Sequence, residues 1–359
     1  MNWGELITLE YGKPVKDKDS TDGKVPVYGT NGQIGTSHLP AQCKHPSFIL
    51  GRKGAYRGVH YSDCPFSVID TAFYAEPLTD RIDLKWAYYK FLTYDINGMD
   101  SGSAIPSTDR YQIYSIEVEV PPLEKQRKIV AVLDCIDRKI NINQKVNDNL
   151  LRQAQALYKN RFIDLKPFNG EMPPDWQLGT VSEIIELHDS KRIPLSSRER
   201  ANLTKIYPYY GATSVMDYVD RYLFDGIYLL LGEDGTVVDD KGFPILQYVE
   251  GKFWVNNHAH IITGKNGFTV ETLYLLFSLT NVQSIVTGAV QPKISQANLN
   301  NVSVVIPSKA ELGTFNSIVQ PIFSQIRNLR AESDRLTATR DILLPRLMSG
   351  EIDATNIQL

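Results

Sequence analysis

A glycine-bounded basic loop is the part of the sequence best suited to binding an anionic partner. The segment Gly51–Gly58 reads GRKGAYRG, which places three bases and one tyrosine between its glycines. An arginine fork can bind O6 and N7 of guanine, and glycine lets the backbone approach a phosphate. The loop could equally be an ordinary solvated hairpin tip. Its candidate DNA contacts are Arg52, Lys53, Tyr56 and Arg57.

A second loop with the same glycine spacing carries acids instead of bases. The segment Gly232–Gly235 holds Glu233 and Asp234 between its glycines. A carboxylate repels phosphate but can accept a hydrogen bond from N4 of cytosine, although an acidic turn is also commonplace. Polar residues in two matched turns and two matched loops complete the set of candidate DNA contacts: Thr30, Asn31, Thr213, Ser214, Ser101, Ser103, Gln291 and Lys293.

The sequence contains no recognisable set of residues for catalysis or metal binding. His258 and His260 have the spacing of two metal ligands on one strand face, but no nearby cysteine or third histidine completes a site. The GxxxxGK[ST] phosphate loop is missing. So is the Asn/Asp-Pro-Pro-aromatic tetrad of adenine methyltransferases, because the Pro-Pro pairs at 121–122 and 173–174 continue as Leu and Asp. We therefore expect no catalytic residue, metal ligand or bound cofactor in this chain.

Composition indicates a soluble globular protein of the cytoplasm. Hydrophobic residues make up 42% and charged residues 22% of the chain, values typical of globular domains. No apolar run approaches the roughly 18 residues of a membrane span, and the N-terminus lacks a signal-peptide core. The three cysteines have no CxxC spacing, which suits a reducing compartment and argues against disulfides or a zinc site. The net charge of −3 neither excludes nor predicts DNA binding, because bases cluster locally.

Two long helices must hold these loops in place. After the Pro121–Pro122 pair, about forty residues without proline or glycine carry apolar residues at alternating spacings of four and three. This pattern is the seam of a coiled-coil helix about 60 Å long. Asn143 and Asn147 in its middle would lower stability while fixing the register. The seam residues are Ile129, Leu133, Ile136, Ile140, Asn143, Asn147, Leu150, Ala154 and Leu157.

The same unit occurs twice in the chain. A second ladder of the same spacing runs from Val319 to Leu347 at an offset of 186 from the first, and the same offset maps Pro121 onto Pro307. We therefore predict a tandem duplication of one globular domain followed by one long helix. The predicted segments are a first domain at 1–120, a helix at 121–165, a second domain at 166–307, and a helix with its tail at 308–359.

Each globular domain should consist of short strands and turns around one helix. In the first domain we expect a hairpin at 25–35, strands within 47–61 and 65–77, a helix at 84–92, and an alternating strand before Pro121. The fold class is thus α+β. Two helices of matched length in a tandem repeat should pair as an antiparallel coiled coil about a pseudo-two-fold axis, although each could instead pack only on its own domain.

Two stretches of the sequence resemble a known family. The run PPLEKQRKIVAVLDCIDRKI and the ending LLPRLMSGEID look like the conserved helices of the DNA-specificity subunit of type I restriction–modification systems. The resemblance extends over the whole chain, as two target-recognition domains, each followed by a spacer helix. It implies a non-catalytic subunit that binds double-stranded DNA and no membrane, with each target-recognition domain reading one half of a bipartite, asymmetric site.

The resemblance also implies partners. Two methyltransferase subunits, which bind S-adenosylmethionine and methylate adenine N6, would dock along the helices, and restriction (motor-nuclease) subunits are a further partner that it leaves open. Two other classes of function stay open: a self-contained DNA-modifying enzyme and a coiled-coil scaffold for protein partners. The missing cofactor and catalytic motifs count against the enzyme, and a scaffold would fail to bind DNA even with its partner present.

Overall fold

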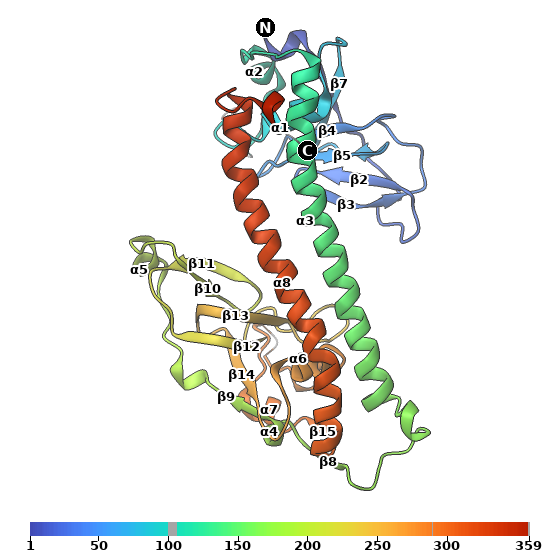
Figure 1. Cartoon of the computed structure of the whole chain (residues 1–359), viewed down its shortest axis with the longest axis vertical. Helices are drawn as coiled ribbons and strands as arrows, with labels where there is room; N and C mark the ends of the chain where they lie inside the picture. The colour runs from blue at the N-terminus through green and yellow to red at the C-terminus, as the bar shows by residue number, and fades with distance from the viewer. Residues whose placement is uncertain (100–105, 289, 358–359) are drawn as a thin grey trace. The chain divides into compact units, whose positions relative to one another are not determined.

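The chain folds into two compact units that share two long helices (Figure 1). The computed structural model describes residues 1–99, 106–288 and 290–357. One unit comprises Met1–Ile142 and Glu332–Leu359, and the other comprises Asn143–Ala331. Each unit therefore contains one globular part and a segment of each long helix, α3 (Leu123–Tyr158) and α8 (Lys309–Met348). No helix in the described part of the chain is long and apolar enough to cross a membrane.

The first unit contains two small sheets. A four-stranded antiparallel sheet has the order β1-β7-β4-β5, and a three-stranded sheet has the order β3-β2-β6. β2 and β3 form the hairpin expected at 25–35, and β2 also pairs in parallel with β6. The strands are β1 (Ile7–Tyr11), β2 (Val25–Gly29), β3 (Gly32–Ser37), β4 (Ser47–Gly51), β5 (Val59–Ser62), β6 (Ser67–Val68) and β7 (Ala72–Pro77).

Helix α1 (Leu84–Phe91) packs on the core of the first unit, as expected for the segment 84–92. Asp83 caps it, since its carboxylate accepts from the N–H groups of Lys85 at 2.9 Å and Trp86 at 3.0 Å. Aspartate is a preferred residue at this position because it satisfies N–H groups that have no partner inside the helix. The buried Trp86 then packs near Trp3, with ring centroids 6.2 Å apart.

A short helix occupies part of the strand predicted before the proline pair. α2 (Arg110–Ser115) begins at Asp109, whose side chain accepts from the N–H of Tyr111 at 3.0 Å. This cap favours a helical turn over an extended strand. Among the described residues the predicted strand keeps only a bridge between Asn2 and Glu117, so the prediction of a continuous strand was wrong here.

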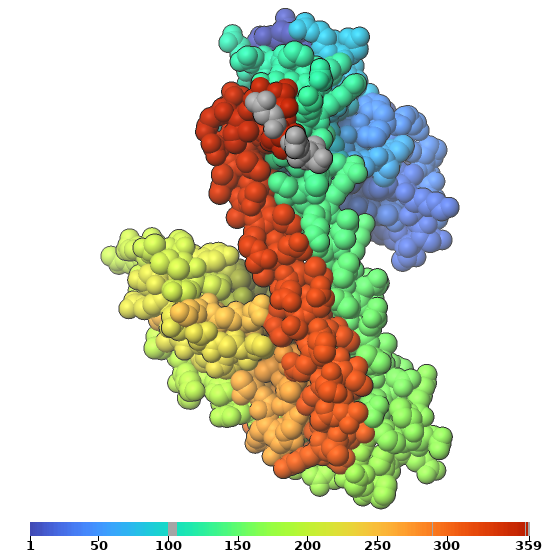
Figure 2. Space-filling view, viewed as in Figure 1, coloured from blue at the N-terminus to red at the C-terminus, as the bar shows by residue number. Residues whose placement is uncertain are grey.

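Within the first unit, α3 and α8 run antiparallel and in contact (Figure 2). Asp137 of α3 pairs with Arg340 of α8 at 3.0 Å, whereas Lys139 lies 3.3 Å from Glu332. Rising numbers on one helix thus meet falling numbers on the other, which confirms the antiparallel pairing in this unit. The buried apolar residues of the two helices here are Ile129, Val132, Leu133, Leu344 and Leu347.

The second unit repeats the first with a larger sheet. Six strands have the order β11-β10-β13-β12-β14-β9, a separate pair joins β15 to β8, and β10–β13 is parallel like β2–β6. The strands are β8 (Gln177–Thr180), β9 (Ile185–Leu187), β10 (Tyr207–Tyr210), β11 (Val215–Val219), β12 (Phe224–Gly232), β13 (Leu246–Val255), β14 (Ala259–Gly264) and β15 (Ser303–Ile306). The shorter helices are α4 (Val181–Ile184), α5 (Ser197–Ala201), α6 (Val270–Ser278) and α7 (Gln296–Asn300).

Aromatic residues replace the predicted seam where α3 ends. Leu157 is 42% exposed, whereas Tyr158 is buried and packs against Phe315 of α8 with ring centroids 5.7 Å apart. Phe162, in the π-helical turn Lys159–Ile163 that follows α3, lies 4.8 Å from the same phenylalanine ring. An α-helix drifts by about 20° per heptad from a strict seven-residue repeat, so the buried stripe has moved to the next residue. The seam prediction for Leu157 was wrong.

Candidate nucleic-acid interface

The two glycine-bounded loops are closed by the same backbone hydrogen bond. In the first unit the N–H of Gly54 donates to the carbonyl of Pro106 at 3.0 Å. In the second unit Gly235 donates to Pro292, also at 3.0 Å. Both glycines have positive φ, at 125° and 83°, a conformation that glycine adopts without the steric cost of a side chain. The repeated glycine spacing in the sequence therefore marks one repeated turn.

A second pair of bonds places Arg52 and Glu233 at equivalent positions. The carbonyl of Arg52 accepts from the N–H of Thr108 at 2.8 Å, and the carbonyl of Glu233 accepts from the N–H of Ile294 at 2.9 Å. The internal repeat thus extends to the backbone frame of the loops. Equivalent positions of this frame carry a base in one unit and an acid in the other.

Two arginines stack on one exposed tyrosine beside the basic loop. The guanidinium carbon of Arg52 lies 4.7 Å from the ring centroid of Tyr11, and that of Arg110 lies 4.8 Å from it. Arg52 donates to the carbonyl of Asp70 at 3.0 Å, and Arg110 donates to the carbonyl of Leu9 at 3.4 Å. Among the described residues no carboxylate lies within 4.0 Å of either guanidinium. The group formed by Arg52, Tyr11 and Arg110, here called the arginine–tyrosine stack, can accept an anion.

Sequence reasoning missed both Tyr11 and Arg110 as parts of this group. Tyr11 ends β1, and Arg110 begins α2, more than fifty residues after Arg52. A basic residue directly after a helix cap is unremarkable by itself. The only available signal was the neighbouring loop, since Thr108 and Asp109 connect Arg110 to the strand-like bridge between Lys53 and Ser107.

Arg57 does not belong to the loop surface. Its side chain is only 2% exposed, and Nη2 donates to the carbonyls of Asn97 at 2.7 Å and Ile96 at 3.3 Å. Nη1 donates to the carbonyl of Gly54 at 3.2 Å. The guanidinium therefore joins the loop to the segment that follows α1. The prediction that Arg57 contacts DNA is corrected, because burial removes its donors from solvent.

The other candidates of the first unit surround the loop to different degrees. Tyr56 is 62% exposed and Asn31 is exposed, whereas Lys53 is half-buried. The hydroxyl of Thr30 is buried without a partner among the described residues, and its carbonyl accepts from the N–H of Gly58 at 3.0 Å. Thr30 thus links the hairpin turn to the loop through its backbone. The candidates Ser101 and Ser103 lie outside the described residues.

In the second unit, Glu233 is neutralised by cations. One carboxylate oxygen lies 2.5 Å from Nη1 of Arg192, and the other lies 3.2 Å from Nζ of Lys293. Burial alone would raise the pKa of this carboxyl. The hydrogen bond from Arg192 and the charge of His260 outweigh burial, and the net pKa lies below its usual value. Because each oxygen already faces a cation, a cytosine N4 donor would have to compete with Arg192 or Lys293, and base reading by Glu233 stays a prediction.

A buried histidine continues this network. Nδ1 of His260 lies 2.6 Å from the carboxylate of Asp189, and Nε2 lies 2.8 Å from the carbonyl of Ile294. The ring therefore links Asp189 to the backbone at Ile294. Asp189 also accepts from the N–H of Ile261 at 2.9 Å and from Gln296 at 2.6 Å. Burial raises the pKa of Asp189, but the hydrogen bond and charge of His260 lower it further, to a net value below normal.

Asp189, Glu233 and His260 lie close enough together to share a metal ion. However, Arg192 and Lys293 already balance Glu233. The carboxylate of Asp189 is likewise engaged, by Arg192 at 3.5 Å and by the donors of Gln296 and Ile261. The cluster therefore fits an ion-pair network better than a metal centre. Asp189 and Arg192 were not recognised from the sequence, because about forty residues or more separate them from Glu233 and His260.

The remaining candidates of the second unit lie near the acidic loop or at a turn. Asp234 pairs with Nδ1 of His258 at 2.5 Å and forms a strand-like bridge with Lys293. The side chain of Lys293 is 48% exposed, and Gln291 is exposed as well. The exposed turn between β10 and β11 carries Thr213 and Ser214. The structure thus brings Asp234, Gln291 and Lys293 to one loop pair.

Comparison with known proteins identifies the family. The model of the type I restriction modification DNA specificity domain matches residues 2–152 and 173–338. The MjaIX specificity subunit of Methanocaldococcus jannaschii is 25% identical over 303 residues, covering 76% of this chain and 70% of that protein. The HindI specificity subunit of Haemophilus influenzae is 19% identical over 355 residues and covers 74% of each chain.

A solved structure shows the same fold. The type I restriction–modification S subunit from M. genitalium superposes with a TM-score of 0.61 at 18% identity, covering 97% of this chain and 95% of that one. Specificity subunits are non-catalytic components of type I restriction–modification systems, which agrees with the missing catalytic motifs. Since the family model covers both globular parts and most of both long helices, the chain belongs to the type I restriction–modification DNA specificity family.

Proposed function

We propose that the chain reads a bipartite, asymmetric DNA site, with one half read by each globular part. The observation that carries this proposal is the equivalence of Arg52 and Glu233 on one repeated backbone frame. Contacts to the DNA backbone position a protein, whereas side chains at base edges specify the sequence. A common frame with different side chains therefore favours similar docking of the two parts and different sequences read by them.

In the first part, we assign DNA contact to Arg52 and Arg110. Neither guanidinium has a carboxylate partner among the described residues, so an anion can bind without breaking an ion pair. Two like charges on one ring repel each other, and a bound phosphate oxygen would relieve that repulsion. Arg52 could instead bind O6 and N7 of guanine. Tyr56 and Asn31 are exposed close to this loop and complete the proposed contact surface.

In the second part, Lys293 is the proposed contact in place of Glu233. Its ammonium group is half exposed, and Glu233 at 3.2 Å balances its charge. A DNA phosphate must compete with that carboxylate, so we expect a smaller electrostatic contribution from this part than from the arginine–tyrosine stack. Exposed polar side chains at Gln291, Thr213 and Ser214 are left to read base edges.

The proposal includes the partners that complete the enzyme. Two methyltransferase subunits would dock along α3 and α8 and supply S-adenosylmethionine and adenine-N6 methylation, while restriction (motor-nuclease) subunits would add cleavage. The assembly would act in the cytoplasm, where its DNA is. Family membership supports these partners, because the relatives are specificity subunits of type I restriction enzymes.

Methylation sequencing tests whether each globular part reads its own half of the DNA site. Arg52→Ala and Lys293→Ala are each reconstituted with the methyltransferase subunits, and the methylated motif is determined for each complex. Each variant should weaken or relax one half-sequence and leave the other half unchanged. Lys24→Ala, which removes an exposed base directly before β2 of the first part, is the matched control and should leave the motif intact. If both test variants alter the same half-sequence, the two-part reading is wrong.

A further inference from the structure

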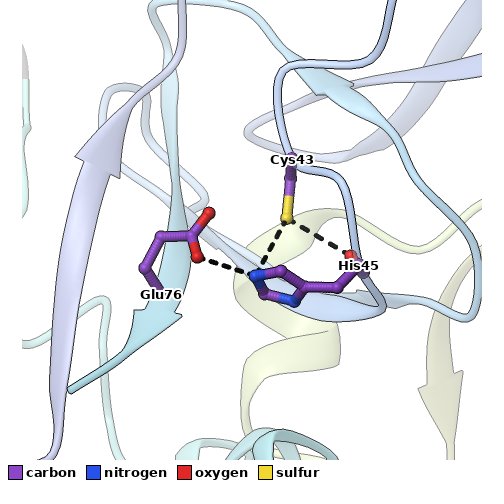
Figure 3. A group of neighbouring side chains, drawn as sticks. All are labelled: Cys43, His45 and Glu76. Atoms are coloured by element: carbon purple, nitrogen blue, oxygen red, sulfur yellow. Dashed lines mark hydrogen bonds and ion pairs between the residues drawn. The ribbon is translucent and has the colours of Figure 1, made fainter.

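Three side chains with metal-ligand chemistry converge in the first unit (Figure 3). Cys43 and His45 lie in the segment that leads into β4, and Glu76 lies on β7. Nε2 of His45 is 2.7 Å from the carboxylate of Glu76 and 3.9 Å from Sγ of Cys43. Figure 3 shows the sulfur and the carboxylate approaching the same ring nitrogen. All three ligand atoms lie within 4.8 Å of one another.

The histidine ring is already oriented as in a metal site. Its other nitrogen, Nδ1, lies 3.0 Å from the carbonyl oxygen of Pro46. A bond of this kind to a backbone carbonyl is what fixes the ring and tautomer of metal-binding histidines. With Nδ1–H donating to Pro46, Nε2 is the nitrogen left to face Cys43 and Glu76.

We propose that Cys43, His45 and Glu76 form a binding site for one divalent transition-metal ion, with Zn²⁺ as the best match. Thiolate, imidazole and carboxylate are the three side-chain ligands that zinc uses. A fourth position would be open to water. The site is independent of the DNA contacts assigned above, and neither its failure nor its success bears on them.

Admitting the ion requires the three ligand atoms to shift. Zinc bond lengths of about 2.0 Å to nitrogen and oxygen and 2.3 Å to sulfur put tetrahedral ligands about 3.3–3.6 Å apart. The sulfur–nitrogen distance of 3.9 Å must therefore close slightly, and the nitrogen–oxygen distance of 2.7 Å must open. Glu76 pairs with no other base among the described residues, so its carboxylate is free to make that shift.

Without metal, hydrogen bonds hold Cys43, His45 and Glu76 in place. Burial raises the pKa of the Cys43 thiol to about 11. Its S–H donates to the carbonyl of His45 at 3.3 Å. Burial alone would lower the pKa of His45, but the hydrogen bond that its ring donates to Glu76 gives a net pKa above the usual value. Metal binding would displace the thiol proton and the proton on Nε2, as ligand groups must deprotonate to coordinate.

Such an ion would join two distant parts of the sequence. It would fasten the segment before β4 to β7, which is the neighbour of β4 in the four-stranded sheet. The sequence did not reveal the site, because the Cys-x-His pair lacks a second pair nearby and Glu76 follows thirty-one residues after His45. The expectation of no zinc site rested on the spacing of the cysteines and on the lack of further ligands near His258 and His260.

The test uses the full chain, stripped with a chelator under a non-thiol reductant and titrated with zinc or cobalt chloride. We expect one ion per chain by calorimetry, and with Co²⁺ the charge-transfer absorbance of a cobalt–thiolate bond. Cys43→Ser should abolish that absorbance and weaken Zn²⁺ binding more than about 100-fold, and Glu76→Gln should weaken it about tenfold. Cys64→Ser, which removes an exposed cysteine outside the group, is the matched control and should bind like the parent chain.

Several results would overturn the proposal. The first is that the parent chain binds no zinc. The second is that the parent and Glu76→Gln chains bind Zn²⁺ with equal affinity. The third is that the cobalt–thiolate absorbance is lost in Cys64→Ser and kept in Cys43→Ser. Cys43 is buried, so its variant could fold poorly. Glu76→Gln changes a partly exposed side chain and keeps the test decisive. Zinc should raise the melting temperature of the parent chain, since binding to the folded state alone stabilises it, and should raise that of Glu76→Gln less.

Discussion

The backbone N–H of Asp83 donates to the side-chain oxygen of Gln126 at 2.8 Å, which joins the cap of α1 to the first turns of α3. The amide nitrogen of the fully buried Gln126 donates to the carbonyls of Arg81 and Pro121, both at 2.8 Å. One side chain therefore satisfies three backbone groups that would otherwise lack partners. This contact attaches the long helix to the globular part of the first unit.

Replacing Gln126 should destabilise the first unit. In Gln126→Leu the three backbone groups lose their partner, and an unsatisfied buried group costs about 1–3 kcal/mol. We expect the free energy of unfolding, measured by denaturant titration, to fall by at least that amount. Arg127→Ala, an exposed neighbour on the same turn, should change it by less than about 0.5 kcal/mol. Equal effects of the two substitutions would mean that these bonds do not hold the helix.

The helix start shows what sequence could and could not reveal. The phrase PPLEKQRKIV marked the beginning of α3 and carried the family resemblance, and both were confirmed. The role of Gln126 was not predictable, because its partner Arg81 is forty-five residues away and is contacted through a backbone carbonyl. Periodicity identifies the side of a helix that is buried, but not a polar residue that satisfies remote backbone groups.

The ion-pair network of the second unit should make stability depend on acid pH. The folded-state pKa values of Asp189 and Glu233 lie below the ordinary 3.8 and 4.5. The contribution of each is therefore present above its unfolded pKa and is lost as pH falls through its folded pKa. We expect the free energy of unfolding to fall between about pH 5 and pH 3, when followed by denaturant titration across that range.

Two substitutions distinguish the contribution of this network to acid unfolding from the contribution of other carboxylates. Glu233→Gln removes one of the two titrating groups, so the decrease in the unfolding free energy with acid should be shallower than in the parent chain. Glu186→Gln replaces an exposed carboxylate on β9 that has no ion pair among the described residues, and its pH curve should overlay that of the parent. A Glu233→Gln curve as steep as that of the parent would exclude the assigned role.

Replacing the polar residue Asn147 in the middle of the helix seam should stabilise the protein. The side-chain oxygen of Asn147 is buried and has no partner among the described residues. Asn147→Leu removes that unsatisfied group and should raise the unfolding free energy by about 1 kcal/mol. Asn149→Leu, at an exposed position on the same helix, should change it little. A lower melting temperature for Asn147→Leu would mean that this residue faces solvent or a partner subunit.

Arg52 and Arg57 should respond in opposite ways to substitution. Arg57→Ala leaves the carbonyls of Ile96 and Asn97 without donors and should cost about 2–4 kcal/mol of unfolding free energy. Arg52→Ala should change that free energy by less than about 0.5 kcal/mol but should weaken DNA binding. Denaturant titration and DNA titration of both variants check this. Loss of stability in Arg52→Ala would show that the arginine–tyrosine stack is structural.

The basic loop shows the limit of motif reasoning about surfaces. The sequence identified the loop, its glycine turn and its repeat in the second unit, but it ranked Arg52 and Arg57 alike. The fold shows that the two side chains have different surroundings. Arg57 is buried and donates to backbone carbonyls, whereas Arg52 stacks on the ring of Tyr11. Similarly, only the fold reveals that Arg192 and Lys293 both pair with the carboxylate of Glu233.

The salt dependence of DNA binding decides what the arginine–tyrosine stack contacts. Each phosphate contact releases counterions and contributes about 0.9 to the slope of log affinity against log salt on B-DNA. If Arg52 and Arg110 both bind phosphate, each alanine variant should lower that slope by about one and weaken all DNA sequences evenly. If Arg52 binds guanine, its variant should lose about 1–3 kcal/mol of discrimination at one base pair. The chain is reconstituted with its methyltransferase subunits, and affinity is measured on matched and singly mismatched duplexes at several salt concentrations.

A variant that combines Arg52→Ala with Arg110→Ala distinguishes one shared phosphate from two separate phosphates. The two guanidiniums share one ring, so a single phosphate bound by both would make the effects of Arg52→Ala and Arg110→Ala less than additive. Two separate phosphates would make the slopes add to a decrease of about two. Lys24→Ala removes one exposed charge elsewhere on the same unit and should leave slope and discrimination at the parent values. If the double variant binds DNA as the parent does at every salt concentration, the stack is not part of the interface, and the contact surface of the first unit must lie elsewhere.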